Sequence, residues 1–384
     1  MKKGITKFWI YIIIFFAVVF VIKYVKENPN SFVGEKAREI LKQEDEIEEV
    51  EIDLSSFNKK DNEEVSKEEL VKEEILEIDY EKIKPNELLE IPVIMYHGLT
   101  EKPSKNVYRR TIEDFEGDLK YLYENDFRLI SMEEFISGKI DVEAGKHPIV
   151  FTWDDGLDTS FSMVRNENGD LIVKENTAVD IMNKFAEEYP DFGKASIFYV
   201  NGNNNPFQGE GTLEEKFKYL LDNGYELGNH TYTHCNFTNK TSEEMQKEIG
   251  KVESMLADNI EGYVGKTLSL PFGSSPKNQD LNKFLFDGKY ENTEYNYLIA
   301  FKEGPSIPKF YPYYHAKYPK LKAPRLRGDD KNSWDMGDFL RKYKQNPSRL
   351  YVSDGNPNRI SVPAGTEDNI NKDRLPEGID IYTY

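Results

Sequence analysis

Two short segments of the sequence carry side chains that can bind a metal ion and activate water. The run Phe151-Thr152-Trp153-Asp154-Asp155-Gly156 places two adjacent carboxylates after an apolar stretch, and Gly228-Asn229-His230-Thr231-Tyr232-Thr233-His234 supplies two imidazoles four residues apart. This spacing in a helical turn brings both rings to one side. Since the chain has only 5 histidines, the pair His230 and His234 predicts a metal site.

The two aspartates are expected to lie in different environments, because adjacent side chains on an extended strand point in opposite directions. Asp154 and Asp155 could therefore have different chemical roles at one site. Each segment alone also has a purely structural interpretation, since Asp-Asp-Gly forms ordinary turns and two histidines can lie in a polar loop.

Short apolar runs alternate with amphipathic stretches from Ile91 onward, which is typical of an α/β domain. The predicted strands are residues 92–96, 128–130, 148–153, 195–200, 227–229, 268–270, 297–301 and 349–353, and the predicted helices are residues 111–125, 131–137, 178–189, 213–223, 241–258, 280–286 and 333–343. The alternation implies parallel strands joined by crossover helices. We expect a distorted (β/α) barrel of about seven strands, with the active site at the C-terminal ends of the strands. Residues 165–173 predict a hairpin around Asn168-Gly169.

Taken together, these segments resemble the polysaccharide deacetylase, or NodB-homology, family (carbohydrate esterase family four). Thr152-Trp153-Asp154-Asp155-Gly156 is similar to the family's Thr-Phe-Asp-Asp-Gly block, and His230-Thr231-Tyr232-Thr233-His234 to its His-Thr-x-x-His block. Ile94-Met95-Tyr96-His97-Gly98 is similar to its first strand. The likeness covers residues 91–275 and, more loosely, the remainder.

The resemblance implies that Asp155, His230 and His234 bind a divalent metal, most often zinc, with cobalt or nickel as alternatives. Asp154 would be the general base. The chemistry is coherent, because a metal polarises the acetamide carbonyl and lowers the pKa of its bound water, while a carboxylate accepts a proton from that water. His97 is assigned to the substrate site, although a hydrogen bond to a loop would also explain it.

The chain departs from the family pattern at two positions. Ser269-Leu270-Pro271-Phe272-Gly273 stands where the family has an Arg-x-Pro-Phe or Arg-x-Pro-Tyr block, and Pro271 and Phe272 are assigned to the substrate site. The arginine that orients the base in the family could be supplied here from elsewhere in the chain. Arg325 and Arg327, in the run Ala323-Pro324-Arg325-Leu326-Arg327, are the first candidates, and Arg325 is assigned to the substrate site.

The second departure concerns the general acid, because the family's late Leu-x-His block is absent and no histidine follows His315. His315 is therefore the candidate catalytic acid, and a water, Asp354 or the metal site itself are the alternatives. His315 lies near an aromatic run, residues 310–314, which could stack on sugar rings or pack within the domain.

The N-terminal sequence predicts a membrane anchor followed by an acidic stalk. Residues 8–22 are apolar without interruption and are flanked by Lys7 and Lys23, so residues 1–25 are expected to span the membrane with the N-terminus inside. A cleaved signal peptide is the alternative. Residues 26–88 are interpreted as a linker and residues 89–384 as the catalytic domain, outside the cell membrane.

Composition limits the partners and the redox chemistry. A net charge of −19 argues against nucleic acid as a partner, and the single cysteine, Cys235, excludes an internal disulfide. The expected function is hydrolysis of N-acetyl groups on amino sugars of peptidoglycan or an exopolysaccharide. The alternatives are a non-catalytic polysaccharide-binding protein that keeps the metal site, and a hydrolase of another amide.

Overall fold

The computed structural model describes residues 79–304, 309–333 and 335–384. The chain divides into two compact units, Met1–Ile75 and Leu76–Tyr384, and the fold below is that of the second. The predicted membrane anchor and nearly all of the predicted stalk lie outside the described residues. Within the described part, the helices are too short or too polar to cross a bilayer.

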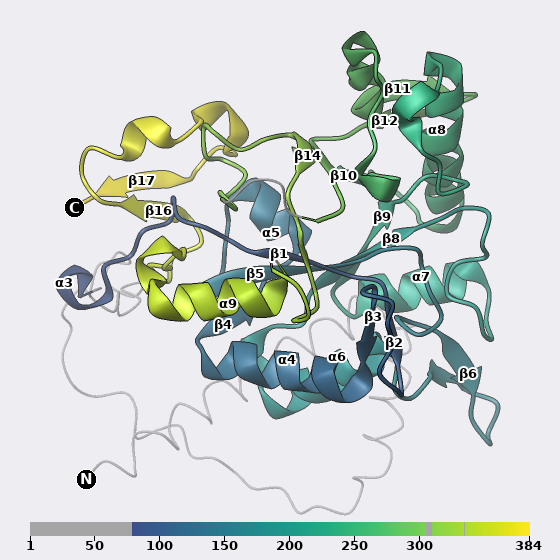
Figure 1. The fold of residues 1–384 in the computed structure, drawn as a ribbon, viewed down its shortest axis with the longest axis horizontal. Coiled ribbons are helices and arrows are strands. Elements are labelled where there is room, and N and C mark those ends of the chain that lie inside the picture. Colours follow the sequence, from purple (N-terminus) through teal and green to yellow (C-terminus); the bar gives the residue numbers. More distant parts are fainter. Residues whose placement is uncertain (1–78, 305–308, 334) are drawn as a thin grey trace, which may run out of the picture. The chain divides into compact units, whose positions relative to one another are not determined.

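A curled parallel sheet forms the centre of the second unit (Figure 1). Its strands are, in spatial order, β14 (Leu321–Ala323), β13 (Ile299–Phe301), β10 (Thr267–Ser269), β9 (Tyr225–Asn229), β8 (Ser196–Val200), β5 (His147–Trp153), β1 (Val93–Tyr96) and β15 (Leu326–Arg327), with β4 (Phe127–Leu129) beside the first half of β5. The central strands are buried along nearly their whole length, as expected for parallel strands covered on both faces.

The two edges of the sheet come together through a single chain segment. β14 pairs with β13 at one edge and β15 pairs with β1 at the other, yet only Pro324 and Arg325 separate these two strands in the sequence. Proline has no N–H to donate to a ladder, so the strand breaks there. The predicted parallel α/β sheet is confirmed, and it forms a curled half-barrel rather than a continuous ring of paired strands.

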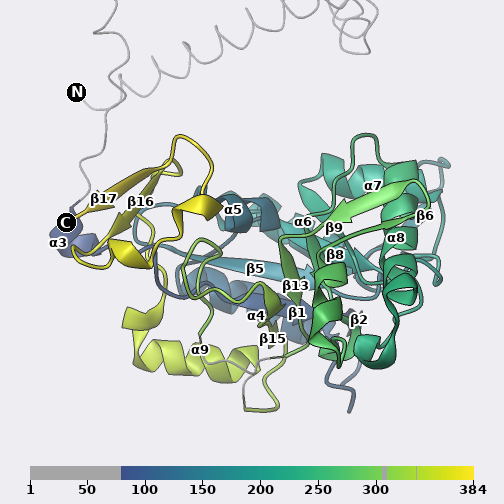
Figure 2. The same ribbon diagram turned by 90° about the horizontal axis from the view of Figure 1, so that it is seen from above.

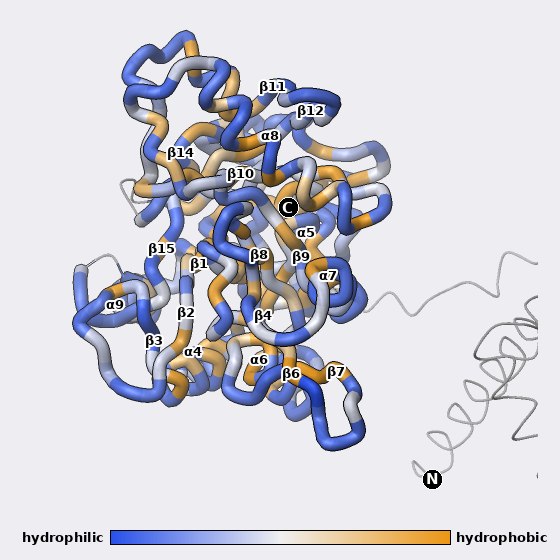
Figure 3. Tube along the Cα trace, turned by 90° about the vertical axis from the view of Figure 1, so that its right-hand side faces the viewer, coloured by the Kyte–Doolittle hydropathy of each residue, from blue (hydrophilic) through white to orange (hydrophobic). Residues whose placement is uncertain are grey.

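Helices lie against both faces of the sheet (Figures 1 and 2): the helix Met132–Ser137 packs with Val93, Val150 and Tyr199 on one face, and the other helices pack on the opposite face. The helices of both faces are α4 (Ile112–Glu124), α5 (Met132–Ser137), α6 (Ala178–Glu188), α7 (Leu213–Asp222), α8 (Ser242–Asn259) and α9 (Met336–Gln345). Thr111, Ser131, Thr177, Thr212 and Thr241 cap the N-termini of the first five helices through their hydroxyl groups. The tube coloured by hydropathy shows apolar residues concentrated on the strands and inner helix faces (Figure 3).

Smaller elements decorate this core. The hairpin β6 (Met163–Arg165) and β7 (Leu171–Val173) forms around Asn168-Gly169 as predicted. The remaining elements are the parallel pair β2 (Gly98–Thr100) and β3 (Arg109–Thr111), the hairpin β11 (Asp287–Tyr290) and β12 (Thr293–Asn296), the parallel pair β16 (Arg359–Val362) and β17 (Asp380–Thr383), and the short helix α3 (Tyr80–Ile83).

Three predictions about elements were wrong. Residues 349–353 do not form a sheet strand: Leu350 and Val352 make isolated bridges to Glu90 and Asn86, because this segment packs against the start of the domain. Residues 279–285 form a 3-10 helix rather than an α-helix. The short strands β14 and β15 were not predicted, because a central proline interrupts their apolar pattern.

The domain also begins earlier than residue 89. Glu87 and Leu88 are buried, and the backbone N–H groups of Asp354 and Ser361 donate to the Glu87 carboxylate at 3.1 and 2.8 Å. Leu76 is the first residue of the compact unit. The charged residues among residues 80–88 concealed this role, because a sequence alone does not distinguish a buried, hydrogen-bonded glutamate from a solvated one.

Candidate metal centre and active site

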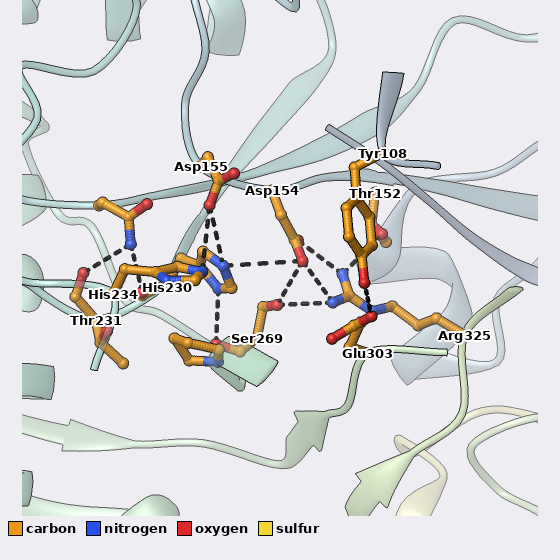
Figure 4. A network of polar contacts seen from close by, with 12 residues as sticks. Tyr108, Thr152, Asp154, Asp155, His230, Thr231, His234, Ser269, Glu303 and Arg325 are labelled. Carbon is orange, nitrogen blue, oxygen red and sulfur yellow. Dashed lines mark hydrogen bonds and ion pairs between the residues drawn. The ribbon is translucent and has the colours of Figure 1, made fainter. Parts of the chain in front are cut away.

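The chemically suggestive residues gather at the C-terminal edge of the sheet, as predicted. His97 follows β1, Asp154 and Asp155 follow β5, and His230 follows β9. Parallel strands end at the same edge, so residues distant in sequence meet there. Figure 4 shows Asp155 above the two imidazoles, with Asp154 between His230 and Arg325.

Asp155, His230 and His234 form a three-ligand cluster. The Nε2 atoms of His230 and His234 lie 3.4 and 3.5 Å from Asp155 Oδ1, and the three ligand atoms lie within 4.8 Å of one another. Ligands at zinc distances in a tetrahedron are separated by roughly 3.3 Å. The cluster therefore fits a divalent metal of that size.

Hydrogen bonds hold the loop that carries the candidate metal ligands His230 and His234 in place. The Nδ1 atom of His230 donates to the Ser269 carbonyl at 2.9 Å, a tautomer that leaves the Nε2 lone pair directed at Asp155. Asn201 Nδ2 donates to the carbonyls of His230 and Thr231 at 2.6 and 3.1 Å. The backbone at Asp155, Thr231 and His234 is left-handed, with φ of 78°, 65° and 54°, a conformation that non-glycine residues adopt at a cost and that clusters at functional sites.

Asp154 has entirely different partners. Arg325 Nη1 and Nη2 donate to its two carboxylate oxygens at 2.8 and 2.6 Å, and Ser269 Oγ donates to Oδ2 at 3.1 Å. Arg325 Nη2 also donates to Ser269 Oγ at 2.8 Å. The small Ser269 side chain leaves room for a guanidinium that arrives from the β14–β15 break. Arg325 thus occupies the base-orienting position that the sequence analysis left to Arg325 or Arg327.

Electrostatics keep both aspartates ionised. Burial raises the pKa of Asp154, but Arg325 and His230 outweigh it, and the pKa lies well below its ordinary value. Burial also raises the pKa of Asp155, and its interactions with His230 lower it further than burial raises it. Burial lowers the pKa of His230, yet Asp154 and Asp155 raise it overall. The same negative potential favours a bound cation.

A cavity of about 180 Å³ opens over this cluster. Its lining residues are His97, Asn106, Tyr108, Arg109, Asp154, Asp155, Leu157, His230, His234, Leu270, Phe272 and Glu303. His97 is the remaining imidazole of the cavity, and its Nδ1 atom is buried without a hydrogen-bond partner in the described part of the chain. Burial lowers the pKa of His97, although Asp154 and Asp155 oppose the shift. Phe272 is 59% exposed at the cavity and packs edge-on against His234.

Several sequence assignments do not fit this geometry. His315 is not among the cavity residues: it stacks on Tyr311 and accepts a hydrogen bond from the Lys317 N–H, because the chain folds back there toward Ile370. Asp354 is buried against Arg359 and Ser361 instead. Arg327 pairs with Asp335.

Two substrate-site assignments also change. Arg325 is fully buried, so it contacts Asp154 rather than a substrate. Pro271 is buried and does not line the cavity, because it starts the turn that exposes Phe272. The aromatic run at residues 310–314 packs within the domain, since Phe310, Tyr313 and Tyr314 are at most 3% exposed.

The sequence analysis missed Tyr108, Arg109 and Glu303. Glu303 lies two residues after β13, and Tyr108 directly precedes β3. The Tyr108 hydroxyl donates to the Glu303 carboxylate, and the Tyr108 ring lies 4.7 Å from the His97 ring. Glu303 could have been found, because it follows the C-terminal end of a predicted parallel strand.

Part of the domain matches a known protein family. A family model described as polysaccharide deacetylase matches residues 141–284, the stretch that contains Asp154, Asp155, His230 and His234. This stretch of the chain is therefore similar to the polysaccharide deacetylase family. His97 and Arg325 lie outside the matched stretch.

Individual relatives are similar at low identity. A peptidoglycan-N-acetylglucosamine deacetylase from Bacillus cereus is 25% identical over 138 residues, which are 35% of this chain and 39% of the relative. The match thus spans about two fifths of that relative's length.

Among solved structures, the Streptococcus pyogenes deacetylase PplD in complex with acetate is 16% identical, with 66% of this chain and 98% of that chain covered and a TM-score of 0.47. A polysaccharide deacetylase from Bacillus cereus is 21% identical, with 66% and 69% covered and a TM-score of 0.47.

Proposed function

We propose that this chain is a metal-dependent deacetylase that hydrolyses N-acetyl groups on amino sugars of a cell-wall or extracellular polysaccharide. The observation that carries the proposal is the convergence of Asp155, His230 and His234 within zinc-ligand spacing, beside the ionised Asp154. These residues lie within the stretch that matches the polysaccharide deacetylase family.

In the proposed mechanism, a divalent metal held by Asp155, His230 and His234 would polarise the acetamide carbonyl and lower the pKa of the attacking water. Asp154 accepts the proton that this water loses. Arg325 holds both Asp154 oxygens, so the carboxylate keeps one orientation throughout turnover. Its lowered pKa ensures that the base is ionised at neutral pH.

His97 is the proposed proton donor to the leaving amine. It lines the cavity, and its ring is packed by Tyr108. With a lowered pKa, the imidazole is a strong enough acid to release a proton readily once it has taken one up. This assignment replaces His315, whose contacts lie elsewhere.

The test is acetate release from peptidoglycan and from N-acetylglucosamine oligosaccharides by the purified protein. We expect a chelator to abolish release and zinc, cobalt or nickel to restore it. Asp155→Asn should lose metal binding, whereas Asp154→Asn should retain the metal and lose turnover, and metal content can be measured separately. If the metal-loaded protein binds glycans but releases no acetate from them, the result would favour a non-catalytic polysaccharide-binding protein. If the protein hydrolyses only amides that are not carbohydrates, the result would favour the alternative of a hydrolase that acts on another amide.

Residues 1–25 are proposed to anchor the protein in the cell membrane, with residues 26–75 as a spacer and the deacetylase domain outside. The uninterrupted apolar run at residues 8–22 and its lysine flanks support this. The full chain should remain in the membrane fraction after an alkaline wash, and a chain shortened to residues 76–384 should not. Recovery of the full chain in the wash would contradict the anchor.

A further inference from the structure

The active-site cavity contains a cation without a counter-charge among the described residues. Arg109 lines the cavity and is half-buried, and its Nη1 atom donates to Thr159 Oγ1 at 3.4 Å. No carboxylate of the described residues forms an ion pair with Arg109. The next residue, Arg110, in contrast pairs with Asp118 and Asp329 at 2.7 and 3.4 Å.

The position of the Arg109 guanidinium is built into the fold. The side chain lies directly over Gly98, where a methyl group would overlap both Arg109 Nη1 and Thr159 Oγ1. Gly98 follows His97 and is paired with Arg109 in the β2–β3 ladder. The absence of a side chain at Gly98 therefore places a positive charge close to the proposed acid.

The other charged groups of the cavity already have partners. Asp154 is held by Arg325, and Asp155 by the two imidazoles. The Glu303 carboxylate accepts a hydrogen bond from Tyr108, and its negative charge would repel an anion. Arg109 is thus the one place in the cavity where the described residues leave a charge to be neutralised by a ligand.

We infer that Arg109 binds a carboxylate carried by the sugar whose acetamido group is hydrolysed. This inference rests on the proposed function and narrows its substrate class to acetamido sugars with a free carboxylate on the substituent of the adjacent carbon, as in muramic acid units of peptidoglycan that carry no stem peptide. In such a sugar the acetamido group and the ether-linked carboxylate leave neighbouring ring carbons, so both enter one cavity of about 180 Å³. A guanidinium recognises a carboxylate through two parallel hydrogen bonds.

The experiment compares two substrates of nearly equal shape. These are oligosaccharides containing N-acetylmuramic acid with a free carboxylate, and the same oligosaccharides with that carboxylate methyl-esterified. The wild-type protein should favour the free acid in kcat/KM by roughly tenfold or more, mainly through KM. Arg109→Gln should remove the preference, and Arg109→Lys should retain part of it.

Lys105→Gln is the matched control. Lys105 is exposed on the same β2–β3 loop and does not line the cavity, so its loss should leave the preference intact. Melting temperatures of the variants establish that they fold. Calorimetric titration of both oligosaccharides into Asp154→Asn, with and without Arg109→Gln, gives the same comparison without turnover.

The possible outcomes separate the two proposals. Equal use of acid and ester by the wild type, or an unchanged preference in Arg109→Gln, overturns the role of Arg109. Acetate release from neutral N-acetylglucosamine oligosaccharides alone overturns it as well, yet leaves the deacetylase proposal standing. Absence of acetate release from every glycan by the metal-loaded protein overturns the proposed function itself.

Discussion

Asp154 and Asp155 are adjacent in sequence and differ in role because their neighbours differ. Asp155 faces two imidazoles, whereas Asp154 faces a guanidinium and a hydroxyl group. Arg325 is 171 residues from Asp154 in sequence. A buried carboxylate without such a partner would protonate rather than stay ionised. The ionised state that the proposed base requires therefore depends in large part on this distant arginine.

Arg325→Ala should be destabilising and inactive. The variant leaves Asp154 buried without its counter-charge, which costs about 3–5 kcal/mol in the free energy of unfolding. Arg325→Lys keeps the charge but loses the bidentate geometry, so kcat should fall about a hundredfold. Urea denaturation and acetate release measure the two effects.

The matched control for Arg325 is Arg165→Ala, which removes an exposed ion pair with Glu210 and should cost less than about 1 kcal/mol. Wild-type turnover by Arg325→Lys would show that orientation of Asp154 is unimportant.

His97 and His315 give a direct comparison of the two candidate acids. His97→Gln should lower kcat by about 10²–10⁴-fold, with metal content unchanged, because His97 lines the cavity and is not part of the three-ligand cluster. His315→Gln should leave kcat at the wild-type value. Acetate release and metal analysis of both variants test this, and the reverse ranking would restore the assignment made from the sequence.

At the scale of elements, the break between β14 and β15 both joins the sheet edges and delivers Arg325 to the site. The contact of β15 with β1 is close: Gly328 N donates to Met95 O at 2.9 Å, and Gly328 lies against the ring of Tyr96. Tyr96 in turn packs on Trp153, next to Asp154. A displacement of β15 would therefore shift Tyr96 and Trp153 and disturb the position of Asp154.

Two glycine substitutions test this packing. A methyl group at Gly328 would overlap the Tyr96 ring, so Gly328→Ala should cost about 1–3 kcal/mol or more through overpacking and should also lower turnover. Gly117→Ala, within α4, meets nothing nearby and should add about 0.5–1 kcal/mol of stability through helix propensity. Thermal unfolding measures both, and equal stability of the two variants would contradict the predicted contact.

At the scale of the whole molecule, the two ends of the described domain are joined by a buried acidic network. Glu87 is 1% exposed and accepts backbone hydrogen bonds from Asp354 and Ser361. The Asp354 carboxylate accepts from Arg359 Nε at 2.6 Å. Burial, together with the charge of Asp354, raises the pKa of Glu87 to about 8. Folding thus keeps Glu87 protonated at neutral pH.

This raised pKa predicts the pH dependence of stability. Unfolded, Glu87 ionises near 4.5, whereas folded it holds its proton up to about pH 8. The folded state therefore binds more protons in this window, and the Glu87 contribution to the free energy of unfolding falls as pH rises through it. Glu87→Gln should remove this pH dependence. The stability of the variant relative to the wild type should therefore increase as the pH rises.

Urea denaturation of residues 76–384 at several pH values between about 5 and 8 measures this pH dependence. Glu243→Gln, on the exposed face of α8, is the control and should follow the wild type. A pH dependence identical in Glu87→Gln and wild type would exclude the linkage.

The sequence by itself determined the α/β class, most strands and helices, and the edge of the sheet that carries the metal cluster. These follow from local patterns: apolar runs of strand length, amphipathic stretches of helix length, and ligands that stand directly after strands. Only the tertiary structure decided that Arg325 contacts Asp154, that His97 and not His315 lies in the cavity, and that Arg109 faces the cavity with no ion-pair partner among the described residues. Those facts depend on which side chains meet across the curled sheet. Such meetings are fixed by strand order and by close packing at small residues such as Ser269 and Gly98, rather than by any local pattern.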